Sequence, residues 1–331
     1  MEVISELKTK LPIFLSMLVL VGFSGYFFDL RGVLTGGENS KTSSKNTTSS
    51  RLVSDTPVSV KAEPKETIKP QKPHKKTLSF SSVEQLTEFY SVRDWQTDDL
   101  FGDTYILIRS FPEDFHTIRP VERKKKLFQK IMLPHIKWAN RRISRERTRV
   151  IELRNKLEST GQLEINEKNF IKKRILNYEV VEDTPVRVTV ERMNELLKRL
   201  DVVPPSLVLA QAANESGWGT SRFTRRANNI FGEWTYNLSE GIKPKGIDES
   251  ARHRVKVFST IQDSLESYIR NLNTHPAYRT FRTRRENHRD SLDSMTLVQG
   301  LEYSYSRGIE YVEVISSMIR SNQYRKFDDL Q

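Results

Sequence analysis

The stretch Leu209-Ala-Gln-Ala-Ala-Asn-Glu-Ser-Gly-Trp-Gly-Thr-Ser221, followed by Asn228-Asn-Ile-Phe-Gly232, decides the fold of this chain. It predicts a helix that opens at Pro204 and Pro205, because proline suits the first helical turn. The helix consists of apolar and small residues with no clear polar face, and such a helix is a buried one. One carboxylate, that of Glu215, therefore lies at the end of a buried helix, directly before a turn rich in Gly and Trp.

Burial gives Glu215 the properties of a proton donor. Desolvation disfavours the charged carboxylate, raises its pKa and keeps it protonated near neutral pH, as a general acid requires. Gly217 and Gly219 let the chain turn sharply and approach a ligand closely. The alternative is a structural glutamate paired with an arginine, because structural ion pairs also perturb pKa values. The complete motif favours the acid over the ion pair.

Four elements of the sequence together carry a resemblance to a known family. They are Glu215-Ser-Gly-Trp-Gly-x-Ser, Asn228-Asn-x-Phe-Gly232, Asn271-Leu-Asn-Thr-His-Pro-Ala-Tyr278, and a late Tyr303-Ser segment that continues through Gly308 to Tyr311. With them the chain resembles the bacterial glucosaminidases of glycoside hydrolase family 73, in their Bax-type branch. The resemblance covers Val186 to the C-terminus and, more loosely, residues 114–157. It implies a lysozyme-like fold, mainly α (α+β), with a small β-hairpin lobe beside the cleft, and cleavage of peptidoglycan glycan strands after N-acetylglucosamine.

The resemblance also implies a second carboxylate on the hairpin, because glycosidases usually need a second acid as a base or a nucleophile. Glu249 is the choice, and Asp248 and Glu240 are the alternatives. The distance between the two acids decides between retention and inversion of the sugar stereochemistry. The family also admits assistance from the N-acetyl group of the substrate, in which case no second acid is needed.

Further site residues come from the same motifs. The resemblance places Tyr278 at the cleft, where its hydroxyl supports an oxocarbenium-like transition state or the substrate N-acetyl group. His253 and His275 are far apart in the sequence and no His-Glu-x-x-His motif is present, so no metal and no cofactor are expected. Four residues are predicted to bind sugar, although each could equally belong to the core: Trp218, Asn229, Phe231 and Trp234.

Residues 186–331 are predicted to fold as the lysozyme-like domain. Thr189 caps its first helix. Alternating apolar residues and turn residues over 234–258 indicate the hairpin lobe. Ser259 or Thr260 caps the helix that follows the lobe. Two final helices are expected over residues 294–303 and 308–320.

Residues 79–185 are predicted to form a basic helical region. A helix from Ser82 to Tyr90 begins with a serine cap, and two helices divided by Pro134 follow it. The second of these carries an apolar stripe for packing against another helix: Ile136, Ala139, Ile143, Val150, Leu153 and Leu157. Its opposite face is cationic: Arg141, Arg142, Arg145, Arg147, Arg149 and Arg154. A returning helix is expected over residues 169–178, which completes a helical hairpin.

The cationic face has two interpretations. The simpler one is a solvated helix face, and the other is an electrostatic dock for anionic envelope polymers or lipids. Nucleic acid is disfavoured as a partner, because no DNA- or RNA-binding motif accompanies the charge.

The N-terminal residues 1–31 are predicted to be a targeting element. The uncharged and mostly apolar run from Leu11 to Phe28 is just long enough to span a bilayer, and the preceding lysines favour an inside N-terminus. A transmembrane anchor is favoured over a cleaved signal peptide, because no small-x-small site ends the run. Residues 32–78, rich in Ser, Thr, Lys and Pro, are predicted to be a disordered linker. Both alternatives export the rest of the chain, which indicates the bacterial envelope, with the catalytic domain in the periplasm.

Composition narrows the class of protein further. The chain has 331 residues, a net charge of +12 and no cysteine, so a disulfide framework is excluded and a polyanionic partner is favoured. The predicted function is that of an endo-β-N-acetylglucosaminidase with Glu215 as general acid. Within enzymes the alternative is a muramidase or lytic transglycosylase, and outside enzymes it is a non-catalytic wall-binding or scaffold protein. A protein that only binds has no need for a buried acid, which disfavours the last alternative.

Overall fold

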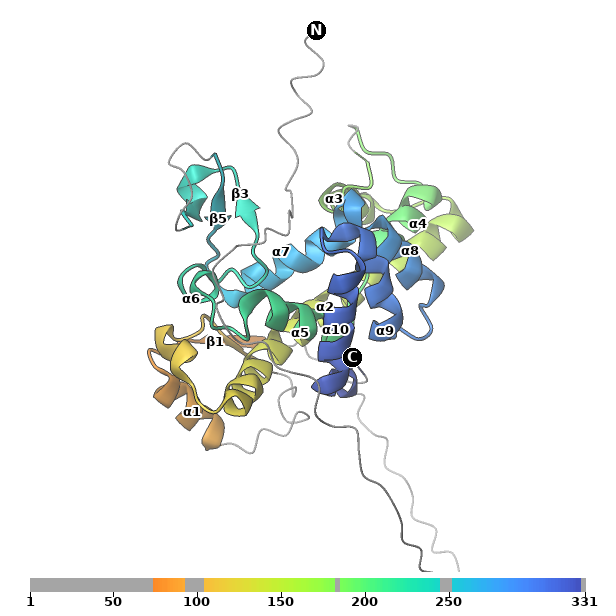
Figure 1. The fold of residues 1–331 in the computed structure, drawn as a ribbon. Helices are drawn as coiled ribbons and strands as arrows, with labels where there is room; N and C mark the ends of the chain where they lie inside the picture. The colour runs from red at the N-terminus through yellow and green to blue at the C-terminus, as the bar shows by residue number, and fades with distance from the viewer. Residues whose placement is uncertain (1–73, 93–103, 182–184, 245–251, 329–331) are drawn as a thin grey trace, which may run out of the picture. The chain divides into compact units, whose positions relative to one another are not determined.

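The helix predicted from the opening motif is α5, Pro205–Ser216 (Figure 1). Its side chains are buried along almost the whole length, as predicted for a helix without a polar face. Proline occupies its first turn, and Gly217 ends it with a left-handed backbone at φ 58°. The Gly217 N–H donates to the carbonyl of Ala213, which closes the last turn directly after Glu215.

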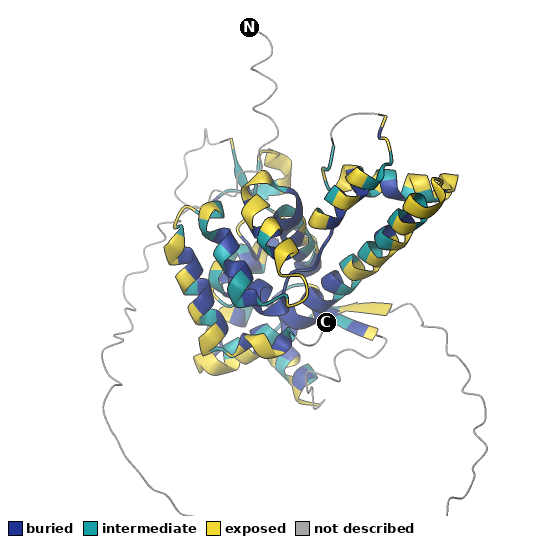
Figure 2. Ribbon diagram, turned by 90° about the vertical axis from the view of Figure 1, so that its right-hand side faces the viewer, coloured by how far each residue is buried: buried dark blue, intermediate teal, exposed yellow. Residues whose placement is uncertain are grey.

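The structure is a computed structural model that describes residues 74–92, 104–181, 185–244 and 252–328. These residues lie in one compact unit, which is mainly helical with two small sheets. The main core surrounds α5 with apolar side chains from three long helices. These are α2 (Val121–Thr160), α7 (Ile261–Thr274) and α10 (Ile309–Ser321). Figure 2 shows that the helices turn one buried face inward and leave the other exposed.

Helix α2 runs unbroken through Pro134, so the prediction of two helices divided there is wrong. A proline inside a helix leaves the carbonyl of the fourth preceding residue, here Lys130, without its usual N–H donor. The hydroxyl of Tyr90 donates to this carbonyl at 3.3 Å and replaces the missing bond. Tyr90 belongs to α1 (Val83–Ser91), which packs into the same core. A contact from another element therefore keeps α2 continuous.

The second half of α2 packs against α3 (Ile165–Asn177) and α4 (Val190–Arg199) in a separate apolar cluster. The predicted stripe is confirmed, with Val150 and Leu153 fully buried in this cluster. Three ion pairs of the described residues join α2 to the returning α3: Lys156 with Glu167 at 2.8 Å, Arg174 with Glu146 at 3.3 Å, and Arg149 with Glu167 at 3.6 Å.

Arg147 does not belong to the solvated face of α2, which corrects the prediction. Its side chain is largely buried, and its Nη1 donates to the carbonyls of Leu197 and Leu200, the latter at 2.9 Å. It also lies 3.5 Å from the carboxylate of Asp201. These partners belong to the end of α4 and to the segment before α5. They lie about fifty residues away in the sequence, so the sequence around Arg147 does not reveal them.

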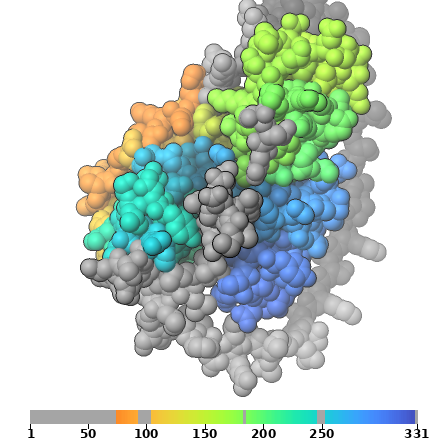
Figure 3. Space-filling view, turned by 90° about the horizontal axis from the view of Figure 1, so that it is seen from above, coloured from red at the N-terminus to blue at the C-terminus, as the bar shows by residue number. Residues whose placement is uncertain are grey.

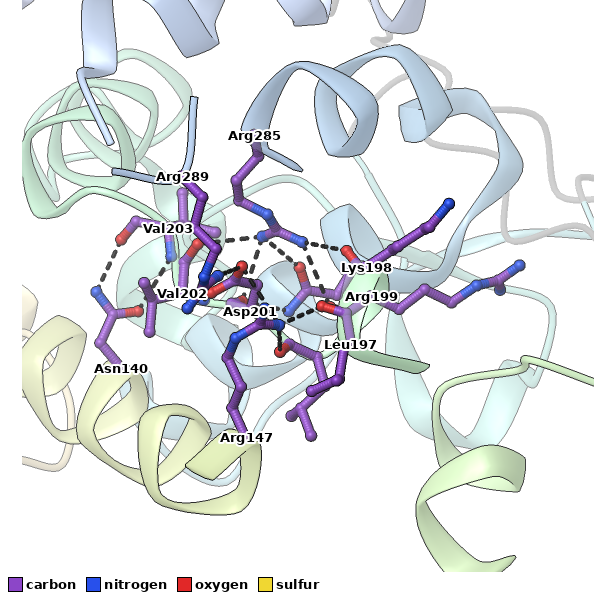
Figure 4. Close-up of polar contacts among 12 residues, drawn as sticks. Asn140, Arg147, Leu197, Lys198, Arg199, Asp201, Val202, Val203, Arg285 and Arg289 are labelled. Atoms are coloured by element: carbon purple, nitrogen blue, oxygen red, sulfur yellow. Dashed lines mark hydrogen bonds and ion pairs between the residues drawn. The ribbon is translucent and has the colours of Figure 1, made fainter. Parts of the chain in front are cut away.

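Arg285 also binds the segment that joins α4 to α5, on the side opposite to Arg147 (Figure 4). It belongs to α8 (Arg279–Asn287) and is fully buried. Its guanidinium donates to Asn273 and to four backbone carbonyls, those of Lys198, Arg199, Asp201 and Val202. The carboxylate of Asp201 also pairs with Arg289, and Asn140 of α2 donates to the Val203 carbonyl at 2.7 Å. This network fixes the point at which α5 begins.

The small antiparallel sheet confirms the predicted lobe. Its strands are β3 (Trp234–Thr235), β4 (Gly241–Ile242) and β5 (Arg254–Lys256), in the order β3-β5-β4. Helix α6 (Arg222–Ala227) precedes the first strand of the lobe, and the 3-10 helix η4 (Leu238–Glu240) lies between β3 and β4. Seen from above, the lobe lies on one side of α7, and α3 and α4 lie on the other (Figure 3). A second sheet, not predicted, pairs β1 (His74–Leu78) with β2 (Thr104–Ile108) in parallel.

Helix starts follow the predicted caps. Ser82 caps α1, Thr189 caps α4, and Thr260 rather than Ser259 caps α7. The first final helix is short, α9 (Ser294–Leu297), and continues as the 3-10 helix η6 (Val298–Ser304). The remaining 3-10 turns are η3 (Glu113–Thr117), η5 (Pro276–Tyr278) and η7 (Tyr324–Phe327).

The predicted anchor at Leu11 to Phe28 and residues 32–73 of the linker predicted over 32–78 lie outside the described residues. The last residues of that linker, 74–78, form β1 and pair with β2, which corrects the prediction that they are disordered. Among the helices that the structure does describe, none combines the length and the apolar character that a membrane span requires.

Candidate active site

Glu215 lies in the last turn of α5, with a surface open to solvent. Its Oε1 accepts hydrogen bonds from Asn214 Nδ2 and from the Tyr311 hydroxyl, both at 3.1 Å. Desolvation by the surrounding protein raises the pKa of its carboxyl above the ordinary value. This effect outweighs the two hydrogen bonds and the positive charge of Arg307, which lower the pKa. The result is a carboxyl group that is reachable from solvent and holds its proton more tightly than a free glutamic acid.

Four tyrosines from different elements converge beside this carboxyl. Tyr268 comes from α7, Tyr278 from η5, Tyr305 from the residue after η6, and Tyr311 from α10. The rings of Tyr305 and Tyr311 stack with centroids 3.8 Å apart, and Tyr278 lies edge-on to Tyr305 at 6.2 Å. Burial raises the pKa of all four, that of Tyr278 to about 12, so the hydroxyls stay neutral and can donate hydrogen bonds.

Gln211 connects three of these tyrosines. It is fully buried and lies one helical turn before Glu215, on the same face of α5. Its Nε2 donates to the hydroxyl oxygens of Tyr305 and Tyr311, each at 2.9 Å. Its Oε1 accepts the hydroxyl of Tyr268. A continuous chain of hydrogen bonds therefore runs from Tyr268 through Gln211 and Tyr311 to Glu215.

The turn after Glu215 explains the Gly-Trp-Gly sequence. Trp218 has a positive φ of 53° and packs partly buried against the main core, with Lys125 over its ring at 5.3 Å. Gly219 has a φ of 78°, and a Cβ there would lie 2.7 Å from a ring carbon of Phe111. Only glycine fits this backbone so close to an aromatic ring. Trp218 thus packs against the core with part of its surface exposed, and its contact with sugar stays a prediction.

Asn229 and Phe231 have different surroundings within the Asn-Asn-Ile-Phe-Gly segment. Asn229 is buried and ties the base of the lobe together: its Nδ2 donates to the carbonyls of Glu233 and Lys256, at 2.7 and 2.8 Å. Phe231 stacks face to face on Tyr268, with ring centroids 3.8 Å apart. Phe231 therefore belongs to the wall behind the tyrosines, and Asn229 positions the lobe.

Trp234 lies on the lobe itself, in β3, half-buried and edge-on to His253 at 4.6 Å. Of the predicted residues, Glu215, Phe231 and Tyr278 meet around the tyrosines. Trp234 and Asn229 lie on and under the lobe, and Trp218 lies on the core side of the turn.

Of the three acids predicted as the second carboxylate, the structure describes one. Glu249 and Asp248 lie outside the described residues, and Glu240 is exposed at the end of η4. Glu233 was not predicted, and its side chain is only 12% exposed. Its carboxylate takes an ion pair from Lys256 at 2.5 Å and a hydrogen bond from Ser267 at 2.6 Å. These bonds give Glu233 the role of fastening the lobe to α7.

Sequence reasoning missed Gln211, Tyr268 and Tyr305 as parts of the site. Gln211 carried a signal, since it is a polar side chain inside an otherwise apolar helix, four residues before Glu215. Tyr268 belongs to the apolar stripe of α7 and had no such signal. The late motif was assigned to start at Tyr303, but Tyr303 is exposed and Tyr305 is the residue that reaches the site.

Comparison with known proteins identifies the family of the chain. A family model described as mannosyl-glycoprotein endo-beta-N-acetylglucosaminidase matches residues 190–324, which include α5, the lobe and the tyrosines. The chain is 32% identical to Protein bax of Escherichia coli (strain K12) over 206 residues, which cover 60% of this chain and 70% of that protein. No solved structure matches the chain. With its motif, its helix-terminal acid and these two matches, the chain belongs to the Bax-type glucosaminidase family.

Proposed function

We propose that the protein is an endo-β-N-acetylglucosaminidase that cleaves peptidoglycan glycan strands after N-acetylglucosamine, with Glu215 as the general acid. The family supports a glycoside hydrolase that acts on the cell wall. The observation that carries the proposal is Glu215 itself: a solvent-reachable carboxyl with a raised pKa, held by Tyr311 at the end of a buried helix. A general acid needs both its proton near neutral pH and access to the substrate.

In the proposed reaction the Glu215 carboxyl gives its proton to the glycosidic oxygen as the bond to the anomeric carbon breaks. The leaving sugar departs as an alcohol, and positive charge develops on the ring of the remaining sugar. A second carboxylate or the substrate N-acetyl oxygen stabilises this charge. Water then adds its oxygen to the anomeric carbon and gives up a proton to a carboxylate of the site, which balances the proton that Glu215 donated. We propose Glu249 for the second carboxylate, as the family resemblance implies. Among the described acids of the lobe, Glu233 is already paired with Lys256.

The tyrosines support the charge that develops in this reaction. Tyr278 is neutral and fully buried beside Tyr305, and we propose its hydroxyl as a support for the transition state. For sugar binding we propose the lobe and its base: Trp234 for ring stacking, and Phe231 and Asn229 for the shape of the floor. Trp218 is the weakest of the predicted sugar contacts, because it packs against the core.

We further propose that the N-terminal run anchors the enzyme in the inner membrane, with the catalytic domain in the periplasm. The net charge of +12 supports additional contacts with anionic envelope polymers or lipids. An anchored enzyme would reach the wall through the Ser-, Thr- and Lys-rich linker.

Binding and cleavage are separated by the variant Glu215→Gln, which keeps the shape of the side chain and removes the proton that it transfers. The full-length variant should sediment with purified peptidoglycan as the unmodified protein does, yet release no soluble sugar. Glu313→Gln, at an exposed position on α10, is the matched control and should cleave normally. Equal release by the unmodified protein and Glu215→Gln would refute the assignment. Binding without release by all three proteins would favour the wall-binding alternative.

A further inference from the structure

Gln211 is a buried amide whose hydrogen-bonding groups all have partners. A glutamine side chain offers two N–H donors on Nε2 and one acceptor oxygen, Oε1. The two donors face the hydroxyl oxygens of Tyr305 and Tyr311, and the acceptor faces the hydroxyl of Tyr268. With no exposed surface, Gln211 cannot replace any of these partners by water.

The orientation of the amide decides where the proton of Tyr311 points. In the orientation described, the Tyr311 oxygen accepts from Gln211, so its single O–H is left for Glu215 Oε1 at 3.1 Å. In the reversed orientation Oε1 would take the protons of Tyr305 and Tyr311. Nε2 would then have Tyr268 as its remaining partner, and one buried N–H would stay unpaired. Glu215 would also lose a donor, so the described orientation satisfies more polar groups.

We propose that Gln211 is a positioning residue for Glu215: its amide directs the hydroxyl proton of Tyr311 at the Glu215 carboxylate and holds that carboxylate in place. The inference rests on the proposed function, because it concerns the same acid. Gln211 touches neither the carboxylate nor a substrate and acts through Tyr311 alone.

The charged and titratable groups that face Glu215 come from several elements. Tyr311 and Arg307 approach from α10 and the turn before it, and Tyr305 from the residue after η6. Tyr268 approaches from α7 and Tyr278 from η5. Arg307 is the group among them that carries charge at neutral pH. The direct hydrogen bond from Tyr311 is therefore the contact through which a change at residue 211 reaches the acid.

This role predicts a specific effect on the pH profile. A hydrogen bond to the charged carboxylate favours ionisation, so its loss raises the pKa of Glu215. An acid loses its catalytic proton as pH rises through its pKa, and the alkaline limb of the kcat/KM profile reports that pKa. Gln211→Met keeps the approximate size of the side chain but directs no proton. Gln211→Glu replaces the two donors by an acceptor that draws the Tyr311 proton away from Glu215.

The test uses the full-length protein in these two variants, with Gln262→Glu as a matched control. Gln262 is also a buried glutamine, and it bonds His135 rather than the tyrosines. The alkaline limb for glycan release is expected to move up by about one pH unit in Gln211→Met and by more in Gln211→Glu. In Gln262→Glu it should stay where the unmodified protein has it. A packing defect alone would lower the rate and leave the limb in place.

A second readout keeps the inference separate from the proposed function. Carbon-13 NMR of labelled glutamate carboxyls gives the pKa of Glu215 directly, with the signal identified by its loss in Glu215→Gln. A raised pKa in both residue-211 variants would support the positioning role even if the unmodified protein released no sugar, which would sink the proposed function alone. Glycan release with an unmoved limb and an unmoved pKa in folded variants would overturn the positioning role and leave the function standing.

Discussion

The stability of the fold should depend on pH through one buried histidine, His135 of α2. Its Nδ1 lies 2.8 Å from Oε1 of Gln262 in α7, and its Nε2 lies 3.1 Å from the carbonyl oxygen of Ile108 in β2. A charged imidazolium would donate to both oxygens, yet burial is the larger effect and lowers the pKa of His135 to about 4. Nearby Lys75 lowers it as well, and Glu266 opposes this.

The magnitude follows from the difference between the folded and the unfolded chain. In the unfolded chain the pKa of His135 is close to 6.5, so between pH 4 and 6.5 the unfolded state binds more protons than the folded state. The free energy of unfolding therefore rises with pH across this window and levels off above it. A difference of about 2.5 pH units, at about 1.4 kcal/mol each, amounts to about 3.5 kcal/mol at most.

Urea unfolding of the full-length protein between pH 4.5 and 7.5 measures this contribution. His135→Gln lacks the titrating group, so its free energy of unfolding should rise less steeply with pH than that of the unmodified protein. The gap between the two slopes should total about 2 to 3 kcal/mol over the window. His116→Gln, an exposed position, should follow the unmodified protein. Parallel curves for the unmodified protein and His135→Gln would refute the burial argument.

Three further substitutions test other parts of the structure. Tyr311→Phe removes the hydroxyl bonded to Glu215, so the pKa of that carboxyl should rise. The alkaline limb of kcat/KM should then move to higher pH by about one unit, and an unmoved limb would contradict the contact. Arg285→Met leaves the carbonyls before α5 without their buried donor. Urea titration should show a free energy of unfolding lower by about 3 to 5 kcal/mol, and a loss below about 1 kcal/mol would contradict the anchoring role of Arg285. Gly219→Ala forces a methyl group against Phe111 at a positive φ and should lower the thermal midpoint, with a cost of about 1 to 3 kcal/mol; an unchanged midpoint would contradict the close packing.

Local sequence predicted those parts of the fold that depend on neighbouring residues. The start of α5 at the two prolines, its end at Gly217, and the caps Ser82 and Thr189 each rest on contacts within a few residues. The apolar run before Glu215 correctly predicted a buried helix, but the Glu215 side chain at its end is exposed rather than buried. Such signals lie inside one element and can be read without the fold.

Contacts between distant segments were not predictable in this way. Pro134 leaves α2 intact because the hydroxyl of Tyr90, from a helix much earlier in the sequence, donates to the Lys130 carbonyl that the proline leaves without a partner. Arg147 is buried because its guanidinium pairs with Asp201 and donates to a carbonyl after the end of α4. The tyrosines meet at Gln211 from three elements, and nothing in the sequence around Tyr268 indicates that meeting. Each case depends on the tertiary arrangement rather than on local pattern.

The most direct measurement is mass spectrometry of the sugar ends that the full-length protein releases from purified peptidoglycan, with Glu215→Gln as control. The account predicts new reducing N-acetylglucosamine ends that are absent in the control. Reducing N-acetylmuramic acid ends, or their anhydro form, would contradict the glucosaminidase assignment and indicate a muramidase or a lytic transglycosylase. The same N-acetylglucosamine ends from Glu215→Gln would contradict the role of the acid.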